Sequence, residues 1–444
     1  MRYMESLLLC FIALLFAIPS SLAIHRHENI KYGDCPAVHD LLQSNVYLQK
    51  SILNYGAAET HHAEVFSLLN RQLKQGQDTH IMFTGSSITA IGYFVDFVDY
   101  LSVNESRKLT VVNLGRGAAD TSYHLHCVPY EGNTPDVIFA DFRFTDWQSD
   151  RLISEALFRK LQTLRRRDGG LPLLVLMHFG RVSDACKTNS AFFSPMIGQY
   201  GLSSIDLCLL TRYCFGHHNY EKWPLYSGDK VHPTTNLSRA FIADAMIEWW
   251  KTASIRYSTE LDLMGSEASD PKAYVLPPPL HKTKALGSHT HCQIAPPENH
   301  ITSGTSAMDL LMPLHTNGFV TKTRVKFGAL SFQNVKSCWQ GSEVGHSITF
   351  PFTGTTLQMA IYQNPENMGM IDAYLDQEST PRTTITGYFE GYEWAKQNGR
   401  QMVVPVFAGL SAGKHTVTFK INSQPANPKK PGHDVQIIAL MFAE

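Results

Sequence analysis

The sequence predicts two domains in succession: a parallel β-sheet covered by helices, and then a β-sandwich. Between about residues 52 and 250, apolar strand-like runs alternate with helical patterns, as in a parallel sheet with helical crossovers. Beyond a proline-rich stretch the hydrophobic period changes to two, and short alternating strands are broken by Gly and Pro turns. With 444 residues, 43% of them hydrophobic, the chain is long enough to bury two cores.

Four apolar runs are the expected strands of the first domain. Their nearly continuous apolar character suits strands that are buried on both faces of a parallel sheet. They cover residues 80–84, 109–114, 136–142 and 173–179. Residues 155–167 and 239–250 carry apolar side chains at helical spacing, so both segments are expected helices.

The first 23 residues predict the compartment. An apolar run over residues 7–18 follows Arg2 and is followed by a small-residue exit at Ala23, which is the pattern of a cleaved signal peptide. A membrane anchor needs about 18 or more apolar residues, and Pro19 cuts this run short. We therefore expect residues 1–23 to be removed and the mature protein to be secreted and extracellular, with no membrane span.

The remaining chain divides where the hydrophobic pattern changes. Residues 24–251 are the expected first domain, and residues 252–288 the linker, because periodicity fades there and Pro277–Pro279 is incompatible with helix or central strand. Residues 289–444 are the expected β-sandwich. Its alternating apolar triplets are Ile348, Phe350 and Phe352; Leu357, Met359 and Ile361; and Val417, Phe419 and Ile421.

The cysteines and sequons fit a secretory route. Eight cysteines less Cys10 leave an odd number, so most should pair in an oxidising compartment while at least one keeps its thiol. Cys292 and Cys338 are the only two in the C-terminal region, and we expect them to bond to each other, which leaves the unpaired thiol in the first domain. Asn104 and Asn236 each begin an Asn-x-Ser sequon and are glycosylation candidates.

The charge balance excludes several partner classes. Thirty-eight Lys and Arg face 39 Asp and Glu, a net charge of −1 without long runs of either sign. Nucleic acid and anionic membranes are therefore not expected partners.

The histidine clusters lack an i, i+4 pair with a third ligand nearby, so no metal or other cofactor is expected.

A serine and an Asp-x-x-His segment carry the expected chemistry. Ser87 follows the first strand where the chain turns into a helix, which is where open α/β sheets hold their ligands. A serine hydroxyl needs a base within hydrogen-bond reach and a third group that orients the base. Asp229 and His232, three residues apart before a helix, offer both groups on one short turn. Taken singly, the serine could simply cap a helix, and the Asp-x-x-His segment could simply be a surface turn.

Together, the segments resemble the four blocks of the SGNH, or GDSL-like, hydrolase family. Ser87 stands in a first block, residues 83–89, at the place of the nucleophile, with Ser86 where Asp or Gly is usual. A second block, residues 113–123, follows the second strand. A third, residues 141–146, follows the third strand, and Asp229 and His232 match the last block, with Pro233 after them as the pattern expects.

The resemblance implies a three-layer α/β/α sandwich and a serine esterase mechanism. Ser87, Asp229 and His232 are then the catalytic triad. The oxyanion hole is formed by Ser87, by Gly117 of the second block and by Thr145, which stands where the family has an Asn donor. Loss of that donor lowers turnover by about 10²- to 10³-fold unless the threonine hydroxyl substitutes.

A competing serine motif lies in the second domain. Residues 409–413, Gly-Leu-Ser-Ala-Gly, fit the G-x-S-x-G nucleophile elbow. That elbow needs a helix after it, whereas β-alternating residues 415–421 follow here. We interpret the segment as a hairpin turn.

An aromatic segment at residues 387–394 favours a carbohydrate substrate, because flat rings stack on the apolar faces of sugars. Packing of those rings in the sandwich core is the alternative. We expect an esterase that hydrolyses an acetyl-like O-acyl ester; an acylated polysaccharide is the favoured substrate, and a small ester is the alternative. A polysaccharide O-acyltransferase shares the same acyl-enzyme, so the sequence leaves that alternative open. A third possible function is that of a secreted, non-enzymatic glycan-binding protein that has a hydrolase fold without hydrolase activity.

Overall fold

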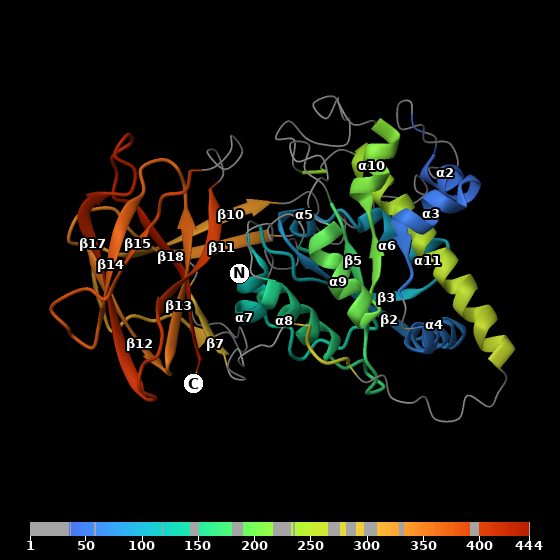
Figure 1. The fold of residues 1–444 in the computed structure, drawn as a ribbon, viewed down its shortest axis with the longest axis horizontal. Helices are drawn as coiled ribbons and strands as arrows, with labels where there is room; N and C mark the ends of the chain where they lie inside the picture. Colours follow the sequence, from blue (N-terminus) through green and yellow to red (C-terminus); the bar gives the residue numbers. More distant parts are fainter. Residues whose placement is uncertain are drawn as a thin grey trace, which may run out of the picture.

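The structure, a computed structural model, describes most of the chain in a series of segments. These are residues 35, 37–56, 59–117, 119–142, 151–179, 190–215, 232–233, 236–264, 276–280, 290–296, 309–327, 333–390 and 399–443. Figure 1 shows a helix-covered sheet beside a body made of strands alone.

The first sheet has six strands in the order β1-β6-β5-β4-β2-β3. Strands β2 to β6 run parallel, and β1 pairs antiparallel with β6 at one edge. The bounds are β1 (Leu53–Asn54), β2 (Asp78–Gly85), β3 (Lys108–Asn113), β4 (Val137–Asp141), β5 (Leu173–Met177) and β6 (Ser203–Ile205). The four predicted strands all form, and their neighbours in the sheet are those of a parallel crossover fold.

Helices cover both faces of this sheet, so the first domain has three layers. Side chains alternate along each strand: Ile81 and Phe83 pack into a core with α4, α6 and α11, whereas Met82 packs into a second core with α7, α8 and α9. The helices are α2 (Val38–Ser44), α3 (Val46–Ile52), α4 (Glu59–Lys74), α5 (Ser87–Ala90), α6 (Val95–Val103), α7 (Thr121–Cys127), α8 (Arg151–Gln162), α9 (Ser190–Tyr200), α10 (Leu207–Phe215) and α11 (Asn236–Met264). Among the described residues, no helix is long and apolar enough to cross a membrane.

Helix α11 continues past the boundary at residue 251 that the sequence pattern predicts, and ends at Met264. Two apolar residues one turn apart, Ala253 and Tyr257, remain buried beyond that boundary. The Tyr257 ring stacks on Phe66 of α4 and on His62, with ring centroids 5.6 and 5.5 Å apart. The first part of the predicted linker is therefore helix packed on the first domain.

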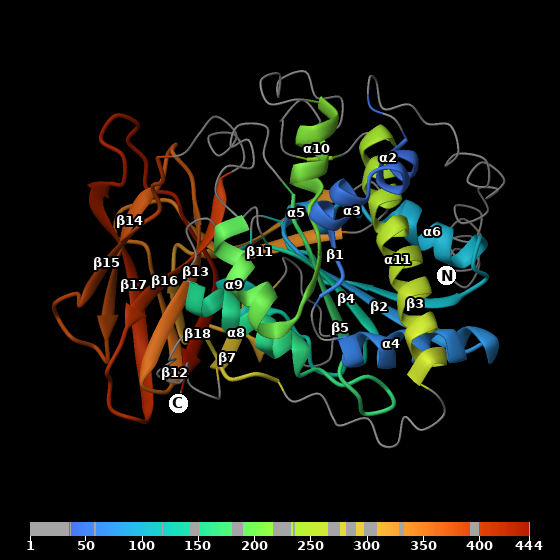
Figure 2. The ribbon, with the colours of Figure 1, turned by 45° about the vertical axis from the view of Figure 1, so that its right-hand side comes forward.

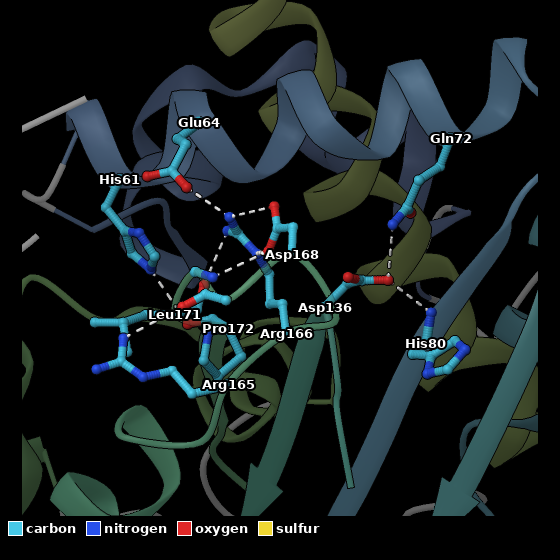
Figure 3. Close-up of polar contacts among 12 residues, drawn as sticks. His61, Glu64, Gln72, His80, Asp136, Arg165, Arg166, Asp168, Leu171 and Pro172 are labelled. Atoms are coloured by element: carbon cyan, nitrogen blue, oxygen red, sulfur yellow. Dashed lines mark hydrogen bonds and ion pairs between the residues drawn. The ribbon is translucent and has the colours of Figure 1, made fainter. Parts of the chain in front are cut away.

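A polar network ties α4 to the amino ends of the strands (Figure 3). The buried Arg166 side chain pairs with Glu64 of α4 at 2.5 Å and with Asp168 at 2.9 Å. The Asp136 carboxylate accepts from the backbone N–H of His80 at 2.8 Å and from the Gln72 amide at 3.2 Å. These contacts fix the sheet end that lies opposite the predicted catalytic serine.

The second domain consists of two antiparallel-rich sheets packed face to face. A seven-stranded sheet runs β10-β11-β18-β13-β16, with β7 paired to β18 and β8 paired to β7. The other sheet runs β15-β14-β17-β12-β9. The bounds are β7 (Thr290–Ile294), β8 (Asp309–Leu310), β9 (His315–Asn317), β10 (Val320–Phe327), β11 (Gln333–Gly341), β12 (Ser347–Thr353), β13 (Thr356–Gln363), β14 (Gly369–Leu375), β15 (Thr383–Thr386), β16 (Arg400–Phe407), β17 (Lys414–Pro425) and β18 (Val435–Ala443). The predicted apolar triplets of β12, β13 and β17 are all buried between the sheets.

The seven-stranded sheet also packs against the first domain. Its outward residues Ala439 and Met441 share a core cluster with Tyr123 and Cys127 of α7. Helix α7 contacts β7, β16 and β18, and lies on the side of the first domain that faces the sandwich (Figures 1 and 2). β18 is consequently buried on both faces along most of its length.

The proline stretch is held against the first domain as well. The Pro277 and Pro278 carbonyls accept hydrogen bonds from Arg159 of α8 and from Gln199 of α9. The backbone N–H of Leu280 donates to Glu155 at 2.6 Å. This part of the linker therefore runs over α8 and α9 rather than apart from them.

The predicted Cys292–Cys338 bond is wrong. Cys292 bonds to Cys127, with Cα atoms 5.2 Å apart, and so joins the two domains. The register on β18 gives the reason: Cys292 lies opposite Met441, whereas Trp339, next to Cys338, lies opposite Ile437. This offset of about three residues is roughly 10 Å along a strand, beyond disulfide reach.

The remaining cysteines also differ from expectation. Cys338 keeps its thiol in the second domain, where it is buried and donates to Gln436 at 3.9 Å. The predicted location of the thiol in the first domain is therefore wrong for the cysteines that the structure describes. Cys35 bonds to Cys214, and Cys208 is disulfide-bonded.

Candidate active site

Ser87 begins α5 directly after the central strand β2. Within residues 81–90 it is the one residue that is not buried. The preceding Gly85 has φ +149°, and a Cβ there would lie 2.1 Å from the carbonyl oxygen of Asp141. Only glycine fits this close approach of β2 to the end of β4, so the turn that exposes Ser87 depends on Gly85.

Two bonds to Asp141 fix the turn. The Ser86 backbone N–H donates to the Asp141 carbonyl at 3.0 Å, and the Ser86 hydroxyl donates to the buried Asp141 carboxylate at 3.1 Å. The Ser86 hydroxyl also accepts from the Ile88 N–H, which caps α5. Ser86 is thus committed to the structure of the turn and leaves Ser87 as the accessible hydroxyl.

The structure brings Ser87 and His232 together across 145 residues of sequence. His232 Nε2 lies 2.8 Å from Ser87 Oγ, within the range of a strong hydrogen bond. Both residues are partly buried, and Pro233 behind His232 is buried. Asp229, the predicted orienting carboxylate, lies outside the described residues.

The loop after β3 docks on the first turn of α5. The backbone N–H of Arg116 donates to the Gly85 carbonyl at 2.8 Å, and the Asn113 amide donates to the Thr89 carbonyl at 3.2 Å. A Cβ on Gly115 would lie 2.4 Å from the backbone nitrogen of Ala90, so this contact requires glycine. Gly117, the predicted oxyanion residue, is buried in this loop. Thr145 lies outside the described residues.

A buried group of three polar residues beneath the turn was not predicted from the sequence. The Tyr130 hydroxyl lies 2.7 Å from Thr84 Oγ1 and 2.9 Å from His124 Nδ1. Burial, and then the charge of Arg116, lower the pKa of His124 to about 3, so its ring is neutral at physiological pH. The one sequence signal was Thr84, a polar residue inside an otherwise apolar strand.

Asp120, directly after the docked loop, is a second buried ionisable group. It caps α7 by accepting the Tyr123 N–H at 2.9 Å. Burial raises the pKa of its carboxyl to about 6, against the opposing effects of that N–H and of the charge of Arg400 in the second domain. Asp120 therefore lies between the loop of Gly117 and α7, the helix that packs on the sandwich.

The raised pKa of Asp120 predicts a pH-dependent stability. The folded protein holds this proton more tightly than an unfolded chain with the ordinary pKa of 3.8, so the free energy of unfolding falls as pH rises from about 4 to 6. The contribution is about 3 kcal/mol. Asp120→Asn keeps the cap and should lack this slope, so its unfolding free energy relative to the native protein should rise over that window in urea titrations. A constant difference from pH 4 to 7 would contradict the raised pKa.

The competing serine motif does not form an elbow. Residues 409–413 connect β16 to β17, so a strand and not a helix follows Ser411. The two strands belong to different sheets, so the predicted hairpin turn is in fact a crossing between sheets. Among the described residues, no group of three His, Cys, Asp or Glu is arranged to hold a metal ion.

The structure describes both glycosylation candidates and part of the aromatic segment. Asn104 and Asn236 are both exposed, at the ends of α6 and α11. In the aromatic segment, Phe389 is half-buried, and the Arg400 guanidinium covers one face of its ring, 3.4 Å from the centroid. Residues 391–398 lie outside the described chain, so the predicted sugar-stacking role rests on the sequence for those positions.

Two solved structures resemble this chain across both domains. They are crystal structures of a two-domain esterase, CEX, active on acetylated mannans, one of them co-crystallised with mannopentaose. Each has 14% sequence identity and a TM-score of 0.62, and the match covers 89% of this chain and 97% or 98% of theirs. At this identity the likeness establishes a common fold. No protein-family model and no curated protein matches the chain.

Proposed function

We propose that this protein is a secreted serine esterase of the SGNH type that removes acetyl-like O-acyl groups from a polysaccharide. The observation that carries the proposal is the 2.8 Å contact between Ser87 Oγ and His232 Nε2 at the carboxyl end of a parallel sheet. The two-domain fold shared with an esterase active on acetylated mannans supports the substrate class. That support is an analogy of fold, so the substrate needs a direct test.

In the proposed reaction Ser87 forms and loses an acyl ester. His232 Nε2 accepts the proton of Ser87 Oγ as the oxygen attacks the ester carbonyl carbon, and Asp229 orients and stabilises the imidazolium. The C–O bond to the sugar then breaks, and the leaving alcohol takes the proton from His232. Water attacks the acyl-enzyme and gives its proton to His232, after which acetate leaves and Ser87 regains the proton. No cofactor takes part.

The backbone N–H groups of Ser87 and Gly117 and the hydroxyl of Thr145 would stabilise the tetrahedral oxyanion. The docking of the Gly117 loop on α5 supports this assignment, because it ties the loop to the turn that carries Ser87.

Thr145 provides a graded test of the oxyanion hole. Thr145→Asn should raise turnover on a simple acetyl ester, because the longer amide reaches further than a β-branched hydroxyl that is stiff about χ1. Thr145→Ala should lower turnover, with KM nearly unchanged in both variants, since the contact strengthens in the transition state. Turnover of Thr145→Ala within about twofold of the native value would remove Thr145 from the hole.

A fluorophosphonate probe tests the function directly. The purified protein should be labelled at Ser87, and label should be lost in Ser87→Ala. Acetate release from an acetylated mannan, followed with and without an added oligosaccharide acceptor, separates hydrolysis from acyl transfer. An unlabelled native protein that still binds glycans would favour the non-enzymatic alternative and reject the esterase.

A further inference from the structure

Three buried polar side chains meet directly beneath the turn that presents Ser87. Thr84 lies near the end of β2, and its side chain is joined to His124 of α7 and to Tyr130. Thr84 Oγ1 lies 2.7 Å from the Tyr130 hydroxyl and 3.3 Å from His124 Nδ1, and the Tyr130 hydroxyl lies 2.9 Å from the same nitrogen. All three residues are 0% exposed. They therefore form a group of mutual hydrogen bonds that is shielded from solvent.

The hydroxyl of Thr84 is not needed by the strand itself. Met82 and Phe83, the neighbouring positions of β2, are buried and apolar, so an apolar residue would suit position 84 as well. The neutral imidazole of His124 has one donor and one acceptor nitrogen, and a hydroxyl both donates and accepts, so the ring pairs with a hydroxyl in either tautomer. A buried polar network whose members are paired fixes one arrangement of the elements that it joins. The group therefore specifies where the end of β2 lies relative to α7.

His124 also contacts the strand on the other side of the turn. It lies in the middle of α7, the helix that begins directly after the loop of Gly117. Its ring packs edge-on against Phe142, with ring centroids 4.8 Å apart. Phe142 follows Asp141 at the end of β4, and Asp141 holds Ser86 through two hydrogen bonds. One imidazole, bonded to β2 and packed on the residue after β4, therefore restrains both strands that form the turn.

Tyr130 is itself held in place before it meets β2. The Asn133 amide donates to the carbonyls of Tyr130 and Pro129 at 3.0 and 3.2 Å, and the Tyr130 N–H donates to the Val128 carbonyl at 2.9 Å. Lys160 Nζ of α8 lies over the ring, 5.6 Å from its centroid. These contacts fix the hydroxyl relative to α7 and α8, so its hydrogen bond restrains the position of the end of β2.

We propose that this buried group positions the nucleophile for the reaction. Thr84, His124 and Tyr130 are then positioning residues, which hold the end of β2 so that the hydroxyl of Ser87 stays aligned with His232. They act through the two residues of backbone between Thr84 and Ser87, and the inference rests on the proposed function. Misplacement of a catalytic group by about 1 Å is enough to lower the rate on the order of 100-fold. The group therefore affects kcat rather than substrate binding.

The test measures kcat and KM of the full-length protein on p-nitrophenyl acetate, together with the midpoint of thermal unfolding. Tyr130→Phe and Thr84→Val each remove one hydroxyl from the group and keep the rest of the buried side-chain volume. Either change should lower kcat by about 10- to 100-fold, with KM within about twofold. The double variant should be only slightly worse than either single variant, because the two hydroxyls act as a unit.

A conservative variant at the same position separates positioning from stability. Thr84→Ser keeps the hydroxyl and loses a buried methyl group, so it should be less stable than Thr84→Val and yet restore most of the kcat that Thr84→Val loses. If the group only stabilised the fold, kcat would follow stability, and Thr84→Val would be the more active of the two variants.

Tyr200→Phe is the matched control. Tyr200 is also buried and donates its hydroxyl to Glu155, but it ends α9 directly before β6, at the end of the sheet opposite Ser87. This variant should leave kcat and KM unchanged. Unchanged kcat in folded Tyr130→Phe and Thr84→Val, activity that follows stability at position 84, or an equal loss in Tyr200→Phe would overturn the inference. Absence of esterase activity in the native protein would instead reject the proposed function.

Discussion

Replacement of Ser87 by alanine is expected to lower kcat on an acetyl ester by about 10⁴- to 10⁶-fold. The 2.8 Å contact with His232 puts the base within reach of the hydroxyl proton, and no other serine of residues 81–90 is accessible, because Ser86 is buried and donates to Asp141. Once the nucleophile is removed, only binding and the oxyanion donors remain to accelerate attack by water.

The companion change, His232→Ala, should produce a loss of similar size, because the two groups act as a unit. The double variant Ser87→Ala/His232→Ala should then be little worse than either single variant. Asp229→Asn should lower kcat by about 10⁴-fold, since a wrong tautomer leaves the imidazole unable to accept the proton. If either Ser87→Ala or His232→Ala retained turnover within tenfold of the native protein, the serine mechanism would have to be abandoned.

Much of the fold could be predicted because a strand that is buried on both faces has an apolar sequence that is recognisable locally. Strands β2, β4 and β5 are buried on both faces, so their sequences are nearly continuous apolar runs. The end of α11 could not be predicted in the same way. Among residues 252–257, the part of this end whose side chains the structure describes, the buried apolar residues are Ala253 and Tyr257, and two residues are too few to give a periodic pattern.

In the candidate site, too, residues in local motifs could be predicted, whereas contacts between distant segments could not. Ser87 and His232 lie in short motifs whose spacing to a strand end and a helix start could be read from the sequence. The packing of α7 on β16 joins segments about 280 residues apart, and nothing local to either segment signals it. The buried group of Thr84, His124 and Tyr130 likewise exists only once α7 has packed on β2.

The cysteines illustrate how topology overrides proximity in sequence. Cys292 and Cys338 are the nearest pair in the C-terminal region, but both lie beside β18 at positions displaced along it. Cys292 instead faces α7, which the sandwich covers, and so meets Cys127. Strand register and domain packing determine the disulfide pairing, and neither can be predicted from the spacing of cysteines in the sequence.

Removal of this interdomain bond should have a large effect on stability. The Cys127–Cys292 bond closes a loop of 165 residues, and loop-closure entropy of that length corresponds to about 5 kcal/mol of stabilisation. Cys127→Ser/Cys292→Ser should therefore lower the free energy of unfolding by up to about that amount and the Tm by up to roughly 6 °C for a chain of this size. Because α7 is tied to the sandwich at this point, the second domain should also become more susceptible to proteolytic separation from the first.

Cys338→Ala is the matched control for that experiment. Since the Cys338 thiol is outside any disulfide and donates a weak hydrogen bond to Gln436, its removal should lower stability by about 1 kcal/mol. Peptide mapping without reductant should then recover the Cys127–Cys292 cross-link intact. Recovery of a Cys292–Cys338 peptide from the native protein, or a loss in Cys338→Ala equal to that of the double serine variant, would show that the interdomain bond is not the one that stabilises the chain.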